Sequence, residues 1–193
     1  SPSGAGRSTR AAAKVMRVLL FLCLSGTHAQ TSVSPSNYQM LNPPETSRSY
    51  SSVYQNSAPG SGDARSMINS AQSWKAESQN DGEWMLIDAG AEISVGGVVT
   101  QGRADYDEWV TGFTVQTSLD GTTFTGVDGG APGTGMFTGN SDRSTQVRNF
   151  FSTPVRARYV VFIVQSWYSS RISMRAGLLV AFLPPSPPPR PPR

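Results

Sequence analysis

The segment TQGRADYDEWV (Thr100–Val110) brings an arginine, three carboxylates and two aromatic side chains together in a short stretch of chain. Oxygen ligands from Asp105, Asp107 and Glu108 could hold calcium, and two of these carboxylates could act as the acid and base of glycoside hydrolysis. The same side chains, together with Tyr106, could instead form a polar surface that binds hydroxyl-rich ligands. Which chemistry applies depends on the residues that surround the segment.

The beginning of the chain resembles a secretory signal. Met16 and the positive Arg17 precede an apolar run, VLLFLCL (Val18–Leu24), and small residues then lead to a cleavage site after Ala29. Seven apolar residues are too few to span a bilayer. We therefore expect residues 1–15 to be upstream sequence, residues 16–29 to be a signal peptide, and the mature protein to be secreted to the cell surface or matrix.

Cleavage at this site would change the chemistry that the chain can perform. The only cysteine, Cys23, and the only histidine, His28, both precede the cut. A mature chain without them has no thiolate nucleophile, imidazole base, disulfide or His/Cys metal ligand. Four of the 16 basic residues are also removed, so 12 remain against 13 acidic residues, and this balance argues against a nucleic-acid partner.

The central part of the chain consists of short runs rich in Val, Ile, Thr and aromatic residues, without helical periodicity. The runs are Glu83–Gly90, Ile93–Gly102, Trp109–Gly121, Ala157–Trp167 and Ile172–Phe182. Residues 109–118 alternate as a half-buried strand should, and the Asp-Gly pair in LDGTTF predicts a tight hairpin turn. The pattern predicts an all-β fold, either an antiparallel β-sandwich or a jelly-roll barrel.

Two polar segments flank this block. Residues 30–49 contain three prolines and predict a linker, and residues 184–193 (PPSPPPRPPR) predict a polyproline II tail. The tail is interpreted either as a stiff, glycosylated spacer or as a disordered end without a role. The domain itself is predicted to span residues 50–183.

Six blocks of this domain match a known family in order and spacing: QSWKAESQNDGEWMLIDAG, VGGVVTQGR, WVTGFTVQTSLDG, FTGNSDRSTQVRNFF, PVRARYVVFIVQSW and ISMRAGLLV. They resemble the discoidin domain, also called the coagulation factor V/VIII C-type domain, over about Ser51–Val180. The resemblance implies a jelly-roll barrel of about eight strands with ligand loops at one end. It also implies a non-catalytic binding module for carbohydrate, collagen, other proteins or anionic phospholipids. Many members join their ends by a disulfide; here we expect Ser51–Tyr54 to pair with the last strand instead.

By this resemblance, the ligand end consists of Val53–Asp63, Lys75–Asp81 and Arg103–Glu108. The candidate ligand-binding residues are Tyr54, Gln55, Asn56, Trp74, Gln79, Asn80, Asp81, Arg103, Asp105, Tyr106 and Asp107. Aspartates in place of apolar loop tips oppose insertion into an anionic membrane. These residues favour a glycan or glycoprotein ligand, with a protein-protein adhesion module in the extracellular matrix as the alternative.

Three further expectations concern cofactors, assembly and packing. No cofactor is expected, with structural calcium left open, and oligomers or tandem domains would provide avidity. Trp84, Trp109 and Trp167 are expected in the core and Trp74 in a more open position. Arg158 and Arg175 are expected to pair with carboxylates such as Asp88 or Asp120, whereas Arg103 could either pair in this way or bind ligand.

Overall fold

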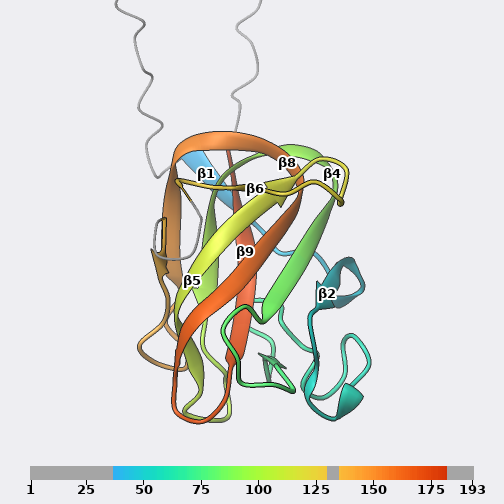
Figure 1. Cartoon of the computed structure of the whole chain (residues 1–193), viewed down its shortest axis with the longest axis vertical. Coiled ribbons are helices and arrows are strands. Elements are labelled where there is room, and N and C mark those ends of the chain that lie inside the picture. Colours follow the sequence, from blue (N-terminus) through green and yellow to red (C-terminus); the bar gives the residue numbers. More distant parts are fainter. Residues whose placement is uncertain (1–36, 130–134, 182–193) are drawn as a thin grey trace, which may run out of the picture. The chain divides into compact units, whose positions relative to one another are not determined.

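The computed structural model describes residues 37–129 and 135–181, which form a curled, antiparallel half-barrel (Figure 1). The predicted segments 1–15, 16–29 and 184–193 lie outside the described residues. The described part of the chain contains nine strands: β1 (Tyr38–Leu41), β2 (Arg48–Tyr50), β3 (Trp74–Lys75), β4 (Trp84–Gln101), β5 (Trp109–Ser118), β6 (Thr125–Gly126), β7 (Phe137–Thr138), β8 (Val147–Tyr168) and β9 (Ser173–Ala181). Two 3-10 helices are also present there, η2 (Glu45–Ser47) and η3 (Tyr54–Asn56). The all-β antiparallel fold class is confirmed.

The sheet has the strand order β1-β9-β4-β8-β5-β6, with β2 and β3 paired to β4 and β9 and with β7 paired to β5. The long strands β4 and β8 curl the sheet, because the register between them shifts at Asp88/Ile93 and at Val95/Gly97. The two runs predicted around residue 90 are therefore one bent strand. Strand β8 begins at Val147, well before the predicted Ala157. The earlier residues were not predicted as a strand because they carry no alternating apolar pattern.

The barrel interior is filled by side chains from β4, β5, β8 and β9. Phe113, Phe162, Met85, Ile87 and Leu178 are all fully buried there. Trp74 is fully buried as well, as the favoured core position required, and it is less open than was expected relative to the other tryptophans. Its indole stacks on Tyr50 with ring centroids 5.6 Å apart, and its Nε1–H donates to the Ser52 carbonyl at 2.8 Å. Trp84 and Trp167 are only half-buried, whereas Trp109 is buried.

The outer edge of the sheet beside β9 is formed by β1, a strand that lies inside the predicted linker at residues 30–49. Tyr38 pairs with Ala181 and Leu41 with Leu178, so β1 occupies the edge of β9 that was assigned to Ser51–Tyr54. The linker boundary at residue 49 and the predicted closing strand were therefore wrong. Four residues between prolines carry too little pattern to predict a strand, and the edge of β9 supplies their hydrogen bonds.

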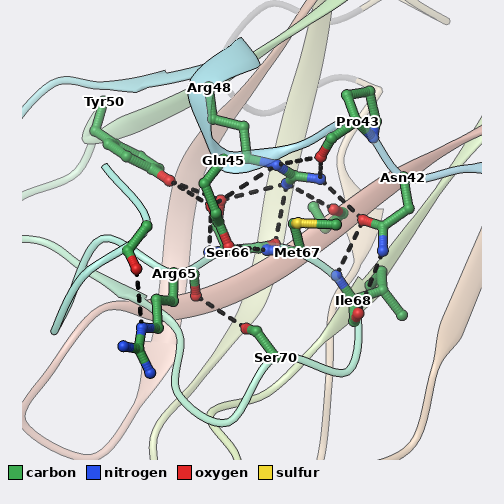
Figure 2. A network of polar contacts seen from close by, with 12 residues as sticks. Asn42, Pro43, Glu45, Arg48, Tyr50, Arg65, Ser66, Met67, Ile68 and Ser70 are labelled. Atoms are coloured by element: carbon green, nitrogen blue, oxygen red, sulfur yellow. Dashed lines mark hydrogen bonds and ion pairs between the residues drawn. The ribbon is translucent and has the colours of Figure 1, made fainter. Parts of the chain in front are cut away.

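A buried arginine ties the first part of the domain to β9 (Figure 2). The Arg48 guanidinium donates to the carbonyls of Ser66 (3.0 Å) and Ala176 (2.8 Å) through Nη1, and to that of Pro43 through Nε (3.1 Å) and Nη2 (3.0 Å). The Asn42 side chain accepts a further bond from Nη2 at 2.9 Å. Burial lowers the pKa of Arg48, and these acceptors compensate for the lost hydration.

Glu45 completes this network from the other side. Its carboxylate accepts the backbone N–H groups of Ser66 and Met67, both at 2.9 Å, and lies 3.9 Å from Arg48 Nε. The Tyr50 hydroxyl contacts Ser66 Oγ at 2.8 Å, and burial raises the pKa of that hydroxyl. Figure 2 shows these side chains converging on the segment around Ser66. This network thus joins segments that are distant in sequence through polar contacts, in a part of the chain (residues 37–129 and 135–181) that contains no cysteine.

Candidate functional site

Five connecting segments gather at one end of the barrel, the lower end in Figure 1. They are the segment around η3, the segment between β3 and β4, the loop between β4 and β5, the turn between β8 and β9, and the segment between β7 and β8, whose Arg143 pairs with Asp107. The first three were predicted as the ligand end, and the last two were not. Strand β5 begins at this end with Trp109, and β8 ends there with Tyr168, its partner in the register.

Arg103 lies at the centre of this end and faces inward. Its residue is only 6% exposed. Its Nε donates to Asp105 at 2.6 Å, and its Nη1 donates to Asp63 at 3.2 Å and to Glu108 at 3.1 Å. Arg103 therefore joins the first and third loops, and its guanidinium is engaged by protein carboxylates; a direct contact with ligand remains a prediction.

The pKa values at this centre reflect the same contacts. Burial of the Arg103 guanidinium opposes its charge, but the carboxylates of Asp105, Glu108 and Asp63 outweigh burial and raise the pKa of Arg103. The hydrogen bond from Arg103 lowers the pKa of Asp105. The contact between Arg103 and Asp105 therefore favours the charged form of both groups, and the surrounding carboxylates are engaged in holding the loops.

The first loop is fixed against the second by Lys75 and Glu77. Lys75 Nζ lies 3.3 Å from Asp63 and 3.7 Å from the centroid of the Tyr54 ring. The Glu77 carboxylate accepts the Gln55 N–H at 2.8 Å. Gln55 and its neighbour Asn56 have φ angles of 55° and 51°, an uncommon conformation for two consecutive non-glycine residues, and both are exposed. This turn presents two amide side chains to solvent.

In the second loop, the predicted residues separate into two groups. Gln79 is tied into the structure, since its Nε2 donates to the Ala76 carbonyl at 3.0 Å and its Oε1 accepts the Ile172 N–H. Asn80 and Asp81 are exposed. Only the last two are therefore placed to contact a ligand.

Two tyrosines present exposed rings at this end. Tyr106 is 60% exposed, and the Arg103 guanidinium lies 4.9 Å from its ring centroid. Tyr168 is 51% exposed and stacks on buried Trp109, with centroids 4.4 Å apart and an interplanar angle of 4°. Each ring has one face held by the protein and the rest open to solvent. Tyr168 was missed because the predicted strand ended at Trp167; its register opposite Trp109 was the available signal.

Arginines outside the predicted set also contribute. Arg143 forms an exposed ion pair with Asp107 at 2.7 Å, and this hydrogen bond lowers the pKa of Asp107. Arg171, in the β8–β9 turn, lies 5.0 Å from the Tyr54 ring centroid. Neither arginine was singled out, because an isolated loop arginine carries no distinguishing sequence pattern.

The two arginines expected to pair with carboxylates behave differently. Arg158 forms a bidentate pair with Asp88 at 2.8 and 2.9 Å, as predicted. Arg175 is buried and donates to the carbonyls of Gly102, Ser70 and Arg143 instead, so its predicted carboxylate partner was wrong. These carbonyls lie in connecting loops and accept the hydrogen bonds of the buried guanidinium.

The predicted site residues thus divide by position. Those at the surface of the loop end are Tyr54 (half-buried), Gln55, Asn56, Asn80, Asp81, Tyr106 and Asp107, whereas Trp74 and Arg103 are buried and Gln79 and Asp105 are engaged by the protein.

Of the carboxylates considered for calcium, Asp105 and Glu108 bind Arg103 and Asp107 binds Arg143. Within residues 37–129 and 135–181, no group of three or more His, Cys, Asp or Glu side chains is arranged to hold a metal ion. No helix in the described part of the chain has the length and apolar character to cross a membrane.

A curled antiparallel barrel with polar and aromatic side chains gathered on loops at one end defines a discoidin-type binding module. The family model for the F5/8 type C domain matches residues 47–178, and the chain belongs to this family, which confirms the resemblance.

Relatives and solved structures agree with this assignment. The chain is 36% identical to lactadherin from Bos taurus over 109 residues, which cover 55% of this chain and 25% of lactadherin. It is 35% identical to retinoschisin from Mus musculus over 107 residues, which cover 55% of this chain and 47% of retinoschisin. The chain therefore spans less than half the length of these relatives.

The fold is shared with discoidin II from Dictyostelium discoideum at a TM-score of 0.57 and 19% identity, with 76% of this chain and 59% of that chain covered. It is also shared with the family 32 CBM from Clostridium perfringens NanJ, solved in complex with galactose, at a TM-score of 0.54 and 11% identity, with 73% and 99% covered.

Proposed function

We propose that this protein is a secreted, non-catalytic module that binds carbohydrate or a glycosylated matrix or cell-surface partner through its loop end. The observation that carries the proposal is the Tyr168 ring, which Trp109 holds flat on one side while about half of its surface remains exposed. A fixed aromatic face covers the apolar side of a sugar ring and loses little conformational entropy on binding.

The surrounding polar side chains suit the hydroxyl groups of such a ligand. Gln55, Asn56 and Asn80 offer amide donors and acceptors, and the exposed Asp107–Arg143 pair offers both kinds of group side by side. The galactose complex of a module with the same fold supports this ligand class. Secretion rests on the predicted signal peptide, and the absence of a catalytic role rests on the engagement of Asp105 and Glu108 by Arg103.

The proposal is tested with the full chain on a glycan array, followed by affinity measurements on the glycan that binds best. The Tyr168→Ala variant should lose about 5- to 30-fold in affinity, because a stacked aromatic face contributes roughly 1–2 kcal/mol. Leu119→Ala serves as the control, since Leu119 is 54% exposed but follows the far end of β5. Its affinity should be unchanged.

The alternative, a protein-protein adhesion module, makes a different prediction. A chain that binds no glycan but still binds a matrix protein after enzymatic deglycosylation would refute the carbohydrate proposal. Single sites of this kind bind weakly, so oligomers or tandem domains should increase the apparent affinity. Sedimentation of the full chain would establish its oligomeric state.

A further inference from the structure

Two cations converge on one aromatic ring at the loop end. Lys75 Nζ lies 3.7 Å and Arg171 Cζ lies 5.0 Å from the centroid of Tyr54. The ring attracts each cation, but the two positive charges repel each other. Such an arrangement is stable when anions neutralise the cations.

Only one of the two cations has such an anion among the described residues. Lys75 pairs with Asp63 at 3.3 Å, and Asp63 also accepts a hydrogen bond from Arg103. Arg171 forms no ion pair with any carboxylate in the described part of the chain, and its side chain is only partly covered. The Glu77 carboxylate of the second loop is engaged by the Gln55 N–H. The guanidinium of Arg171 is therefore partly exposed, contacts the same ring as a second cation, and has no ion-pair partner among residues 37–129 and 135–181.

We infer that Arg171, which shares the Tyr54 ring with Lys75, forms a subsite for one anionic group, a carboxylate or sulfate, carried by a glycan. A planar guanidinium donates two parallel hydrogen bonds to either group. The ligand charge also removes the repulsion between the two cations. This inference rests on the proposed function and specifies it, because it selects acidic over neutral glycans.

The source of the anionic group is a glycan and not a bilayer surface. The neighbouring loop tips carry Gln55 and Asn56, which offer no apolar side chain for insertion. Asp81 and Asp107 are exposed on adjacent loops and would be repelled by a surface of anionic lipid. A single acidic group on an otherwise neutral glycan would meet far less repulsion than a surface of many anionic headgroups.

The test compares pairs of immobilised glycans that differ only in one sulfate or one carboxylate, with the full chain as the probe. The acidic member of a pair should bind about tenfold more tightly, the effect of one charge-assisted contact, and added salt should reduce the difference. Vesicles containing phosphatidylserine form a separate arm and should not bind.

Variants assign the effect to Arg171. R171Q should abolish the preference, so that the two members of a pair bind with the same affinity, whereas R171K should keep a smaller preference because it retains charge but not the planar pair of donors. R156Q is the matched control, since Arg156 pairs with Glu92 and lines a groove at the β5–β6 hairpin. It removes the same charge and should keep the preference.

Each result has a definite meaning. Equal binding of the two members of a pair, or a preference that persists in R171Q, would overturn the inference and leave the proposed function intact. Binding of phosphatidylserine vesicles without binding of acidic glycans would overturn it in favour of a lipid ligand. Failure to bind any glycan would overturn both proposals.

Discussion

At the scale of single residues, Arg103 determines how the loop end is built. It is one buried guanidinium that contacts carboxylates from two loops, Asp63 on one side and Asp105 and Glu108 on the other. Ser173 adds a further contact from β9 by donating its hydroxyl to Glu108 at 2.9 Å. The charges that made this segment a candidate for chemistry thus serve mainly to hold its shape.

Replacement of Arg103 by Met should lower the free energy of unfolding by about 2–4 kcal/mol, because three carboxylates would remain close together without their shared cation. Urea unfolding at neutral pH measures this change. Arg158→Met is the matched control: its pair with Asp88 is partly exposed and should contribute at most about 1 kcal/mol. Similar losses in the two variants would contradict the central role of Arg103.

The same residue shows what sequence reasoning can reach. Its position beside a loop of carboxylates was visible, but the direction of its side chain depends on Asp63, which is distant in sequence. Trp74 is a comparable case, since its burial depends on Tyr50 and on the Ser52 carbonyl. Whether a side chain near a loop is buried or exposed depends on contacts with residues that are distant in sequence, and a local sequence pattern does not reveal these contacts.

At the scale of elements, the short edge strand β1 packs its Tyr38 ring into the space left by one glycine of β4. A Cβ built on Gly96 would lie 1.8 Å from Cε1 of Tyr38, so the Tyr38 ring occupies the space that a side chain would need. The same ring packs on Phe150 with centroids 5.3 Å apart. Gly96 therefore allows β1 to lie against β4 across the edge of the sheet.

Gly96→Ala should lower the free energy of unfolding by about 1–2 kcal/mol by displacing the Tyr38 ring. In a Tyr38→Ala background the same substitution should cost less than about 0.5 kcal/mol, since the obstructing ring is gone. Chemical denaturation of the four proteins in this cycle provides the values. Additive losses would show that Gly96 acts through something other than Tyr38.

Strands with internal alternation were predicted well, and strands defined by their neighbours were not. Residues 109–118 were expected as a strand and form β5, although most of its residues are buried, so the expected half-buried alternation was wrong. The polar beginning of β8 and the four residues of β1 are held by pairing with β4 and β9, respectively. Their conformation follows from the sheet edge that they meet, so their own residues give little indication of it.

At the scale of the whole molecule, aspartates in several separate loops and strands have lowered pKa values. Hydrogen bonds from Arg158, Arg103 and Arg143 lower the pKa of Asp88, Asp105 and Asp107, respectively. Backbone N–H groups in tight turns have the same effect on Asp120 and contribute to it on Asp142. The folded state therefore favours the ionised form of all five carboxylates.

Stability should consequently fall in acid. A carboxyl whose pKa is lower in the folded state stabilises the protein above its unfolded pKa of about 3.9, and that stabilisation is lost as pH falls through the folded value. The free energy of unfolding should be nearly constant above about pH 5 and decline below about pH 4. Urea unfolding over this range tests the expectation, with Asp88→Asn showing a shallower decline. A stability that increased on acidification would contradict it.

The stack of Tyr168 on Trp109 also makes the protein its own optical probe. Of the four tryptophans, Trp109 is the one whose indole lies 4.4 Å from an exposed ring at the loop end. A sugar placed on Tyr168 would exclude water beside that indole and change the colour and intensity of its emission. Occupancy could then be followed by intrinsic fluorescence, without an attached dye. In a Trp109→Phe protein the emission should not change in the same titration.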